Sequence, residues 1–168
     1  MPKRLAILRH AKSDWDRPGL ADFDRPLNAR GRAAADVIRR KIAARELTFD
    51  LILSSPSART RETLDRLGMA ESARWDDRLY LACRERLFEI IRALPDEAQS
   101  VLIVGHNPGL HELVLELSRP DSNGLRKRVI AKFPTAALAL LDLECASWSE
   151  VARGCGEIAE LLLPREPD

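Results

Sequence analysis

The chain has 168 residues, a length that one domain with a single continuous core can accommodate. Its 27 basic and 26 acidic residues nearly cancel, so its charge favours neither nucleic acid nor a membrane as a partner. No apolar stretch approaches the roughly 20 residues of a membrane-spanning helix, and the apolar run after residues 1–4 is too short for a signal-peptide core. We therefore expect one domain, residues 1–168, in the cytoplasm.

The three cysteines give a weaker indication of the same compartment. Cys83, Cys145 and Cys155 are odd in number and lack the spacing of a metal site. They favour free thiols in a reducing environment, the alternative being a disulfide between Cys145 and Cys155.

Strand-like and helix-like segments alternate along the first two thirds of the chain, a pattern typical of layered α/β folds. Residues 5–8 form an apolar, strand-like run, and residues 14–28 are predicted to be a long loop. Asn28 can cap a helix over residues 29–45, whose apolar positions fall on one face. The same alternation then predicts strand 49–53, helix 58–67, an extended piece within 74–81, helix 85–94, strand 101–104 and helix 108–117.

The last third of the chain is less regular. Residues 118–128 are predicted to be a polar loop, in which Arg126-Lys127-Arg128 is a solvated turn or a contact for an acidic partner. Two strands are expected over residues 129–133 and 136–143, and periodicity does not decide whether 157–163 form a strand or a helix. The whole pattern predicts a single-domain, three-layer α/β/α sandwich around a mostly parallel sheet.

Three apolar strands are each followed at once by residues that suit phosphate chemistry. The first strand leads to Arg9, His10 and Ser13, the second to Arg59, and the third to His106 and Asn107. Because ligands collect at the carboxyl edge of parallel strands, we expect two imidazoles and two guanidiniums to converge on one point.

These residue types can carry out phosphoryl transfer. Arg9 and Arg59 can bind the equatorial oxygens of a transferring phosphoryl group in bidentate fashion. A neutral imidazole at His10 can attack phosphorus in line and form a covalent phosphohistidine. His106, if protonated, adds a third cationic donor, and Ser13 can add a hydroxyl group. The sequence therefore predicts a histidine-dependent phosphatase.

Several of these residues also have an alternative role. Arg59 could pair with Glu62 on the surface of its helix, Ser13 could bond its own backbone in a turn, and Asn107 could either contact substrate or cap the next helix. Three further expectations concern the surroundings: His111 is structural, Asp24 and Arg25 form an ion pair, and Trp15 and Tyr80 pack near the rim of the site.

The motifs resemble those of the histidine phosphatase superfamily. Residues 9–13, Arg-His-Ala-Lys-Ser, resemble its Arg-His-Gly signature with alanine in place of the usual glycine. Residues 55–60 resemble its second-arginine motif, and residues 105–109 its second-histidine motif. Their order and compactness look closest to the SixA-type phosphohistidine phosphatases. Further likenesses lie in residues 24–31 and 79–82, so the resemblance spans residues 4 to 118.

The resemblance implies a phosphoglycerate mutase-like fold, with His10 as nucleophile and Arg9, Arg59 and His106 in the phosphate pocket. It also implies no metal and no organic cofactor. Mutases and acid phosphatases of this superfamily usually place a proton-donating carboxylate between the second arginine and the second histidine. Here that interval is short, and the general acid stays unassigned. The carboxylates in it that lack the expected motif include Asp76, Asp77, Glu85 and Glu89.

A phosphohistidine substrate is compatible with the lack of an assigned general acid, because its P–N bond is labile once the imidazole leaving group is protonated. A short chain also leaves few residues for a lid, so we expect a pocket open enough to admit a protein side chain. The leading prediction is a metal-independent hydrolase that removes phosphate from a phosphohistidine-containing signalling domain. The alternatives are a phosphomonoesterase or a phosphoglycerate mutase-like enzyme with a small phosphorylated substrate, and a catalytically silent phosphate-binding adaptor.

Overall fold

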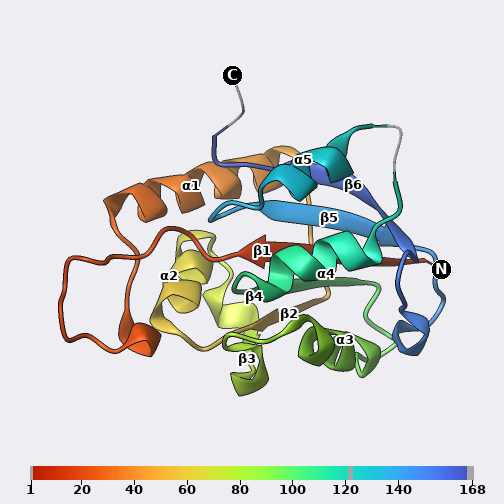
Figure 1. The fold of residues 1–168 in the computed structure, drawn as a ribbon, viewed down its shortest axis with the longest axis horizontal. Helices are drawn as coiled ribbons and strands as arrows, with labels where there is room; N and C mark the ends of the chain where they lie inside the picture. The colour runs from red at the N-terminus through yellow and green to blue at the C-terminus, as the bar shows by residue number, and fades with distance from the viewer. Residues whose placement is uncertain (1, 121–122, 166–168) are drawn as a thin grey trace.

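One six-stranded sheet organises the protein, which is described here by a computed structural model of residues 2–120 and 123–165 (Figure 1). The strand order is β3-β2-β4-β1-β5-β6. The strands are β1 (Lys3–Arg9), β2 (Leu51–Ser54), β3 (Ala73–Trp75), β4 (Ser100–Gly105), β5 (Leu138–Leu143) and β6 (Gly156–Leu162). The first four are parallel to one another, and β5 is antiparallel to both of its neighbours. The expectation of a mostly parallel sheet is confirmed.

Helices cover both faces of the sheet, which explains why the central strands are apolar without alternation. The helices are α1 (Ala29–Ala44), α2 (Ala58–Arg66), α3 (Arg84–Arg92), α4 (Gly109–Leu117) and α5 (Leu125–Ala131). Along β1, Leu5 and Ile7 pack on the face covered by α3 and α4, whereas Ala6 and Leu8 pack on the face covered by α1 and α2. No helix in these described ranges combines the length and the apolar character needed to span a membrane.

One predicted strand is wrong. Residues 129–131 end helix α5 instead of forming a strand over 129–133. The edge of β1 pairs directly with β5, and β5 with β6, so the sheet has no position for another strand there. Leu125 and Val129, four residues apart, place one side of α5 against the core.

The structure also bears on the predictions for the loop before α5 and for the tail of the chain. Arg126 does not lie in a solvated turn, because its Nη2 donates to Leu115 O at 3.1 Å from within the helix. Residues 121–122 of the expected loop 118–128 lie outside the described residues. The tail that periodicity left open forms strand β6, since it pairs along its length with β5.

The start of α1 shows how this helix positions the first loop of the site. The side chain of Asn28 accepts a hydrogen bond from Gly31 N at 2.8 Å, which confirms the predicted cap. At Gly31 the helix comes so close to the chain after β1 that an added Cβ would lie 2.1 Å from Lys12 O. Glycine is therefore required here by close backbone approach, and the packing of α1 fixes the position of Lys12.

We predict that Gly31→Ala destabilises the protein. Alanine in a helix interior is normally favoured over glycine by about 1 kcal/mol, but overpacking against a backbone atom costs about 1–3 kcal/mol, and the second effect dominates at this distance. Urea unfolding should show a lower free energy of unfolding for Gly31→Ala. Arg30→Ala, its exposed neighbour, should stay within about 0.5 kcal/mol of the wild type. Equal or greater stability of Gly31→Ala would contradict this packing.

Candidate active site

Two histidines leave the sheet side by side because their strands are adjacent and parallel. Arg9 lies opposite Gly105 in the register of β1 and β4, and His10 N donates to Gly105 O at 3.1 Å. The rings of His10 and His106 have centroids 5.2 Å apart, and the two residues are 7% and 3% exposed. The pair is therefore a buried feature at the carboxyl edge of the sheet.

His10 is neutral and has one free ring nitrogen. Its Nδ1 lies 2.6 Å from Ala11 O, and because a carbonyl oxygen can only accept, the proton resides on Nδ1. Burial, reinforced by the charges of Arg59 and Arg9, lowers the pKa of His10 to about 4 despite the opposing effect of that hydrogen bond. The lone pair of Nε2 is therefore available at neutral pH, as a nucleophile requires.

His106 is also neutral in the free protein. Burial, together with His10 and Arg59, lowers its pKa to about 3. Arg59 Nη2 lies 3.3 Å from His106 Nδ1 and can only donate, so Nδ1 accepts and the Nε2–H donates to Ser55 Oγ at 2.8 Å. The sequence analysis gave His106 a cationic role on the condition that it is protonated, and in the free protein the lowered pKa keeps it neutral.

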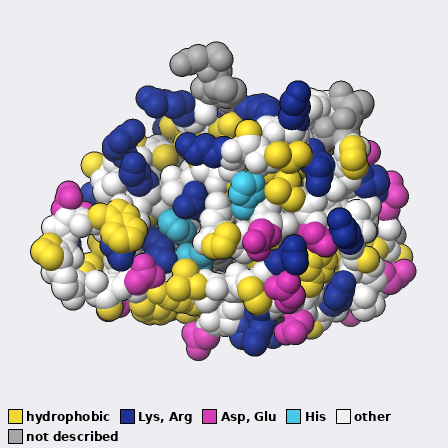
Figure 2. Space-filling model, in the orientation of Figure 1, with side chains coloured by type: hydrophobic (Ala, Val, Ile, Leu, Met, Phe, Trp, Pro, Cys, Tyr) yellow, Lys and Arg dark blue, Asp and Glu magenta, His cyan; other side chains and the backbone are white. Residues whose placement is uncertain are grey.

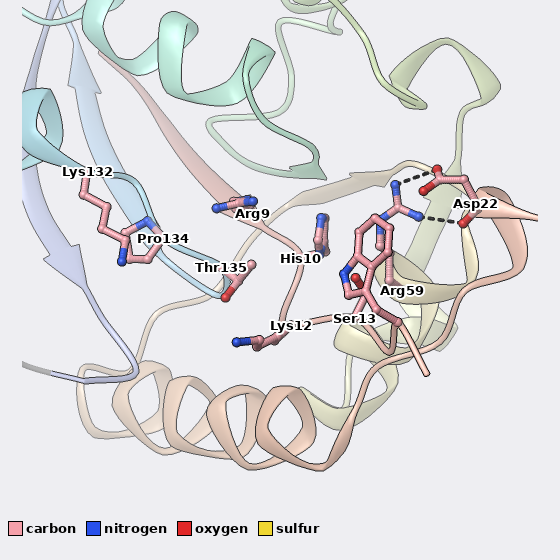
Figure 3. Close-up of a pocket in the computed structure, with 10 residues that line it drawn as sticks. Arg9, His10, Lys12, Ser13, Asp22, Arg59, Lys132, Pro134 and Thr135 are labelled. Carbon is pink, nitrogen blue, oxygen red and sulfur yellow. Dashed lines mark hydrogen bonds and ion pairs between the residues drawn. The ribbon is translucent and has the colours of Figure 1, made fainter. Parts of the chain in front are cut away.

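Arg59 is held by Asp22, a residue of the short 3-10 turn Asp22–Asp24 (Figure 3). Its Nη1 donates to Asp22 O at 2.8 Å and its Nη2 to Asp22 Oδ2 at 3.0 Å. A further bond of Nη2 to His106 Nδ1 fixes the guanidinium beside the two histidines. The alternative partner from the sequence, Glu62, instead pairs with Arg32.

Arg9 is the second guanidinium of the site, and it is half-buried. In the view of Figure 3, His10 stands between Arg9 on one side and Arg59 on the other. Arg9 Nη1 donates to Phe133 O at 3.2 Å, and its buried Nε has no hydrogen-bond partner in the described part of the chain. Burial and the charge of Arg59 lower the pKa of Arg9. An unpaired buried donor in a cationic setting is compatible with an oxyanion ligand.

These groups open into a cavity of about 330 Å³. It is lined by Arg9, His10, Lys12, Ser13, Trp15, Asp22, Arg59, Lys132, Pro134 and Thr135 (Figure 3). Of the six residues predicted for the site, Arg9, His10, Arg59 and Ser13 line the cavity, whereas His106 and Asn107 do not. His106 instead contacts two residues that line the cavity, His10 and Arg59.

The side-chain amide of Asn107 bonds backbone groups of the fold. Its Nδ2 donates to Phe133 O at 2.9 Å, and its Oδ1 accepts from His111 N at 3.2 Å. Asn107 thus bonds a backbone N–H in the first turn of α4, in line with the helix-end role that was one of its two alternatives. His111 bonds Val129 O and does not line the cavity, so it has a structural role as expected.

Asp22 is the residue that the sequence interpretation missed. It receives hydrogen bonds from Tyr80 Oη and from Arg25 Nη2, so the expected partner of Arg25, Asp24, was wrong. Although burial raises it, the bonds from Tyr80 and Arg59 hold the pKa of Asp22 below its ordinary value. Sequence reasoning sought a carboxylate between Arg59 and His106, whereas this one comes from the loop after β1.

Tyr80 and Trp15 both lie near the site, as expected. The ring centroid of Tyr80 is 5.4 Å from that of His106. Trp15 lines the mouth of the cavity and is 71% exposed, with the guanidinium of Arg25 stacked 3.4 Å above its ring.

Comparison with known proteins identifies the class to which this fold and site belong. Residues 5–80 match the family model of the histidine phosphatase superfamily, branch 1. Together with the structure of 35% identity described next, this match shows that the chain belongs to the superfamily.

Particular relatives extend the match over almost the whole chain. The chain is 35% identical to a structure of a candidate phosphohistidine phosphatase SixA from Agrobacterium tumefaciens, with a TM-score of 0.80 over 98% of this chain and 99% of that one. For a candidate SixA from Nakamurella multipartitia the identity is 27% and the TM-score 0.85, over 98% and 97%. An uncharacterized protein of Mycobacterium tuberculosis is 33% identical over 160 residues, which are 94% of this chain and 100% of the relative.

We predict that neither buried histidine titrates near neutrality. Because both pKa values are lowered, to about 4 and about 3, both rings stay neutral as the pH falls from 8 to about 5. NMR titration of the ring Cε1–H signals, assigned with His10→Gln and His106→Gln, measures this directly. A midpoint near 6.5 for either ring would show that burial does not control its charge.

We also predict that Asp22→Asn binds inorganic phosphate more tightly. Removing one carboxylate charge beside the anion relieves about 1 kcal/mol or more of repulsion, equivalent to about fivefold in affinity. Isothermal titration of phosphate measures the change, with Asp24→Asn, an exposed carboxylate on the same turn, as the matched control. Weaker binding by Asp22→Asn would mean that its hold on Arg59 matters more than its charge.

Proposed function

We propose that the protein is a phosphatase that acts through a covalent phosphohistidine at His10. The observation that carries this proposal is a neutral imidazole whose Nδ1–H donates to Ala11 O and whose Nε2 is unprotonated, in a cavity that it shares with the buried guanidinium of Arg59 and the half-buried one of Arg9. Arg9 and Arg59 supply the positive charge that a transferring phosphoryl group needs on its equatorial oxygens. Preorganised cations in a mostly buried site stabilise that charge more strongly than solvent-exposed ones.

The reaction balances without a further reactant except water. In the first step His10 Nε2 forms a bond to phosphorus as the P–N bond of the substrate breaks. A substrate imidazole protonated on its other nitrogen leaves as a neutral ring, so the leaving nitrogen needs no proton. In the second step water attacks the phosphorus on His10, the bond to Nε2 breaks, and dihydrogen phosphate departs while Nδ1 keeps its proton.

We infer that the substrate is a phosphohistidine on a signalling protein. Among the described residues that line the cavity, Asp22 is the one carboxylate, and its lowered pKa keeps it ionised at neutral pH. An ionised carboxylate cannot protonate an alkoxide, so the site suits a phosphoramidate better than an alkyl phosphate ester. The 35% identity to a candidate phosphohistidine phosphatase supports the same substrate class.

The compartment that we propose is the cytoplasm. Cys83, Cys145 and Cys155 are free thiols, which fits the expectation from their number and spacing. Thiols are maintained in this form where glutathione and thioredoxin operate.

The decisive experiment traps the phosphorylated protein. Rapid quench into base after mixing with ³²P-labelled phosphoimidazole should capture a labelled protein, and His10→Ala should lose the label together with at least ~10³-fold in turnover. His111→Gln, which changes a histidine outside the cavity, should keep both, and excess chelator should leave the rate unchanged.

Other outcomes separate the alternatives. Phosphate release from small esters, but not from a histidine-phosphorylated protein, would make the protein a phosphomonoesterase, and isomerised phosphoglycerate would make it a mutase. Phosphate binding with no labelled intermediate would make it an adaptor. Label retained by His10→Ala would place the nucleophile elsewhere.

A further inference from the structure

A second, larger hollow adjoins the candidate active site. Its volume is about 790 Å³, against about 330 Å³ for the cavity of His10, and it is formed by α1, α5 and the chain after β6. Both hollows are lined by Lys12, Lys132, Pro134 and Thr135. A ligand that fills the larger hollow, which we call the α1–α5 groove, is therefore in contact with the walls of the phosphate site.

The floor of the α1–α5 groove is apolar. Ala33, Ala34 and Val37 of α1 lie at helical spacing and face the same side. The floor continues across the groove with Ala131, Leu161 and Leu163. Such a floor stabilises an apolar stripe of a partner by removing both surfaces from water.

The rim of the α1–α5 groove is basic. Lys12, Arg30, Arg128, Lys132 and Arg165 line it, and no carboxylate is among the described residues that do. Figure 2 shows Lys and Arg side chains gathered above the histidines, over α1. The formal charge of the whole chain is only +1, so this cluster is a local field and not a reflection of composition.

We propose that the α1–α5 groove docks an acidic, apolar-faced segment of the phosphorylated protein, next to the residue that enters the catalytic cavity. This inference rests on the proposed function for the identity of the phosphorylated residue. Charge complementarity selects an acidic partner, and the shared lining residues place a segment bound in the groove beside the residue that enters the catalytic cavity. A small phosphate ester would occupy the catalytic cavity without reaching Arg30 or Val37.

The binding test uses two synthetic helical peptides with the same length, apolar pattern and central phosphohistidine. One carries Glu and the other Lys at its polar positions. Fluorescence anisotropy with the His10→Ala protein, which cannot turn the peptides over, should give at least tenfold tighter binding of the acidic peptide. Adding Arg30→Glu or Val37→Asp should weaken that binding by about fivefold or more.

The matched control is Arg40→Glu, since Arg40 is exposed on the same helix and does not line the α1–α5 groove. It changes the net charge equally and should leave binding within about twofold, because exposed charges at a distance are screened by salt. If Arg30→Glu and Arg40→Glu weaken binding equally, or neither does, the groove is not the docking site. Equal binding of the acidic and the basic peptide would also reject the groove as the docking site. It would be rejected as well if neither peptide binds while Arg30→Glu reduces binding to anionic phosphatidylglycerol vesicles.

Turnover separates this inference from the proposed function. With His10 intact, Arg30→Glu should hydrolyse phosphoimidazole at the wild-type rate but lose about fivefold or more in kcat/KM for the acidic phosphopeptide. Failure of the wild type to hydrolyse phosphoimidazole would reject the proposed function, and the anisotropy result would still decide whether the groove binds the acidic segment.

Discussion

The site depends on the parallel pairing of β1 with β4. Arg9 lies opposite Gly105, and a histidine follows each of these two residues in the chain. Both imidazole rings therefore emerge at the same height of the sheet. A shift of one residue in this register would send the side chains of one strand to the opposite face. The apolar runs on both strands, buried under helices on each side, oppose such a shift. The hydrophobic core thus determines the geometry of the polar site.

Burial has opposite consequences for the two kinds of cation in this site. The imidazoles respond by losing their charge, so His10 keeps a lone pair, whereas the guanidiniums retain theirs because their pKa is far above neutrality. Burial and, after it, the nearby charge of Arg59 lower the pKa of Arg9. Asp22 offsets the positive charge of Arg59 in the free protein through its ion pair.

Strand ends could be predicted from the sequence because uninterrupted apolar runs stop abruptly at Arg9-His10 and Gly105-His106. Three features could not. Helix α5 is short, and the β-branched pair Val129-Ile130 resembles a strand until the sheet positions are known to be filled. Asp22 reaches the site only through the course of a long loop, which has no periodicity to reveal it. The charge state of His106 depends on burial, which depends on the whole fold.

The carbonyl oxygen of Phe133 accepts from two side chains, Arg9 at 3.2 Å and Asn107 at 2.9 Å. One oxygen atom thereby joins the ends of β1 and β4 to the corner between α5 and β5. That corner cannot move without lengthening both bonds, and it also supplies Lys132, Pro134 and Thr135 to both hollows. A molecule that packs against α5 would therefore also affect the position of the Arg9 guanidinium.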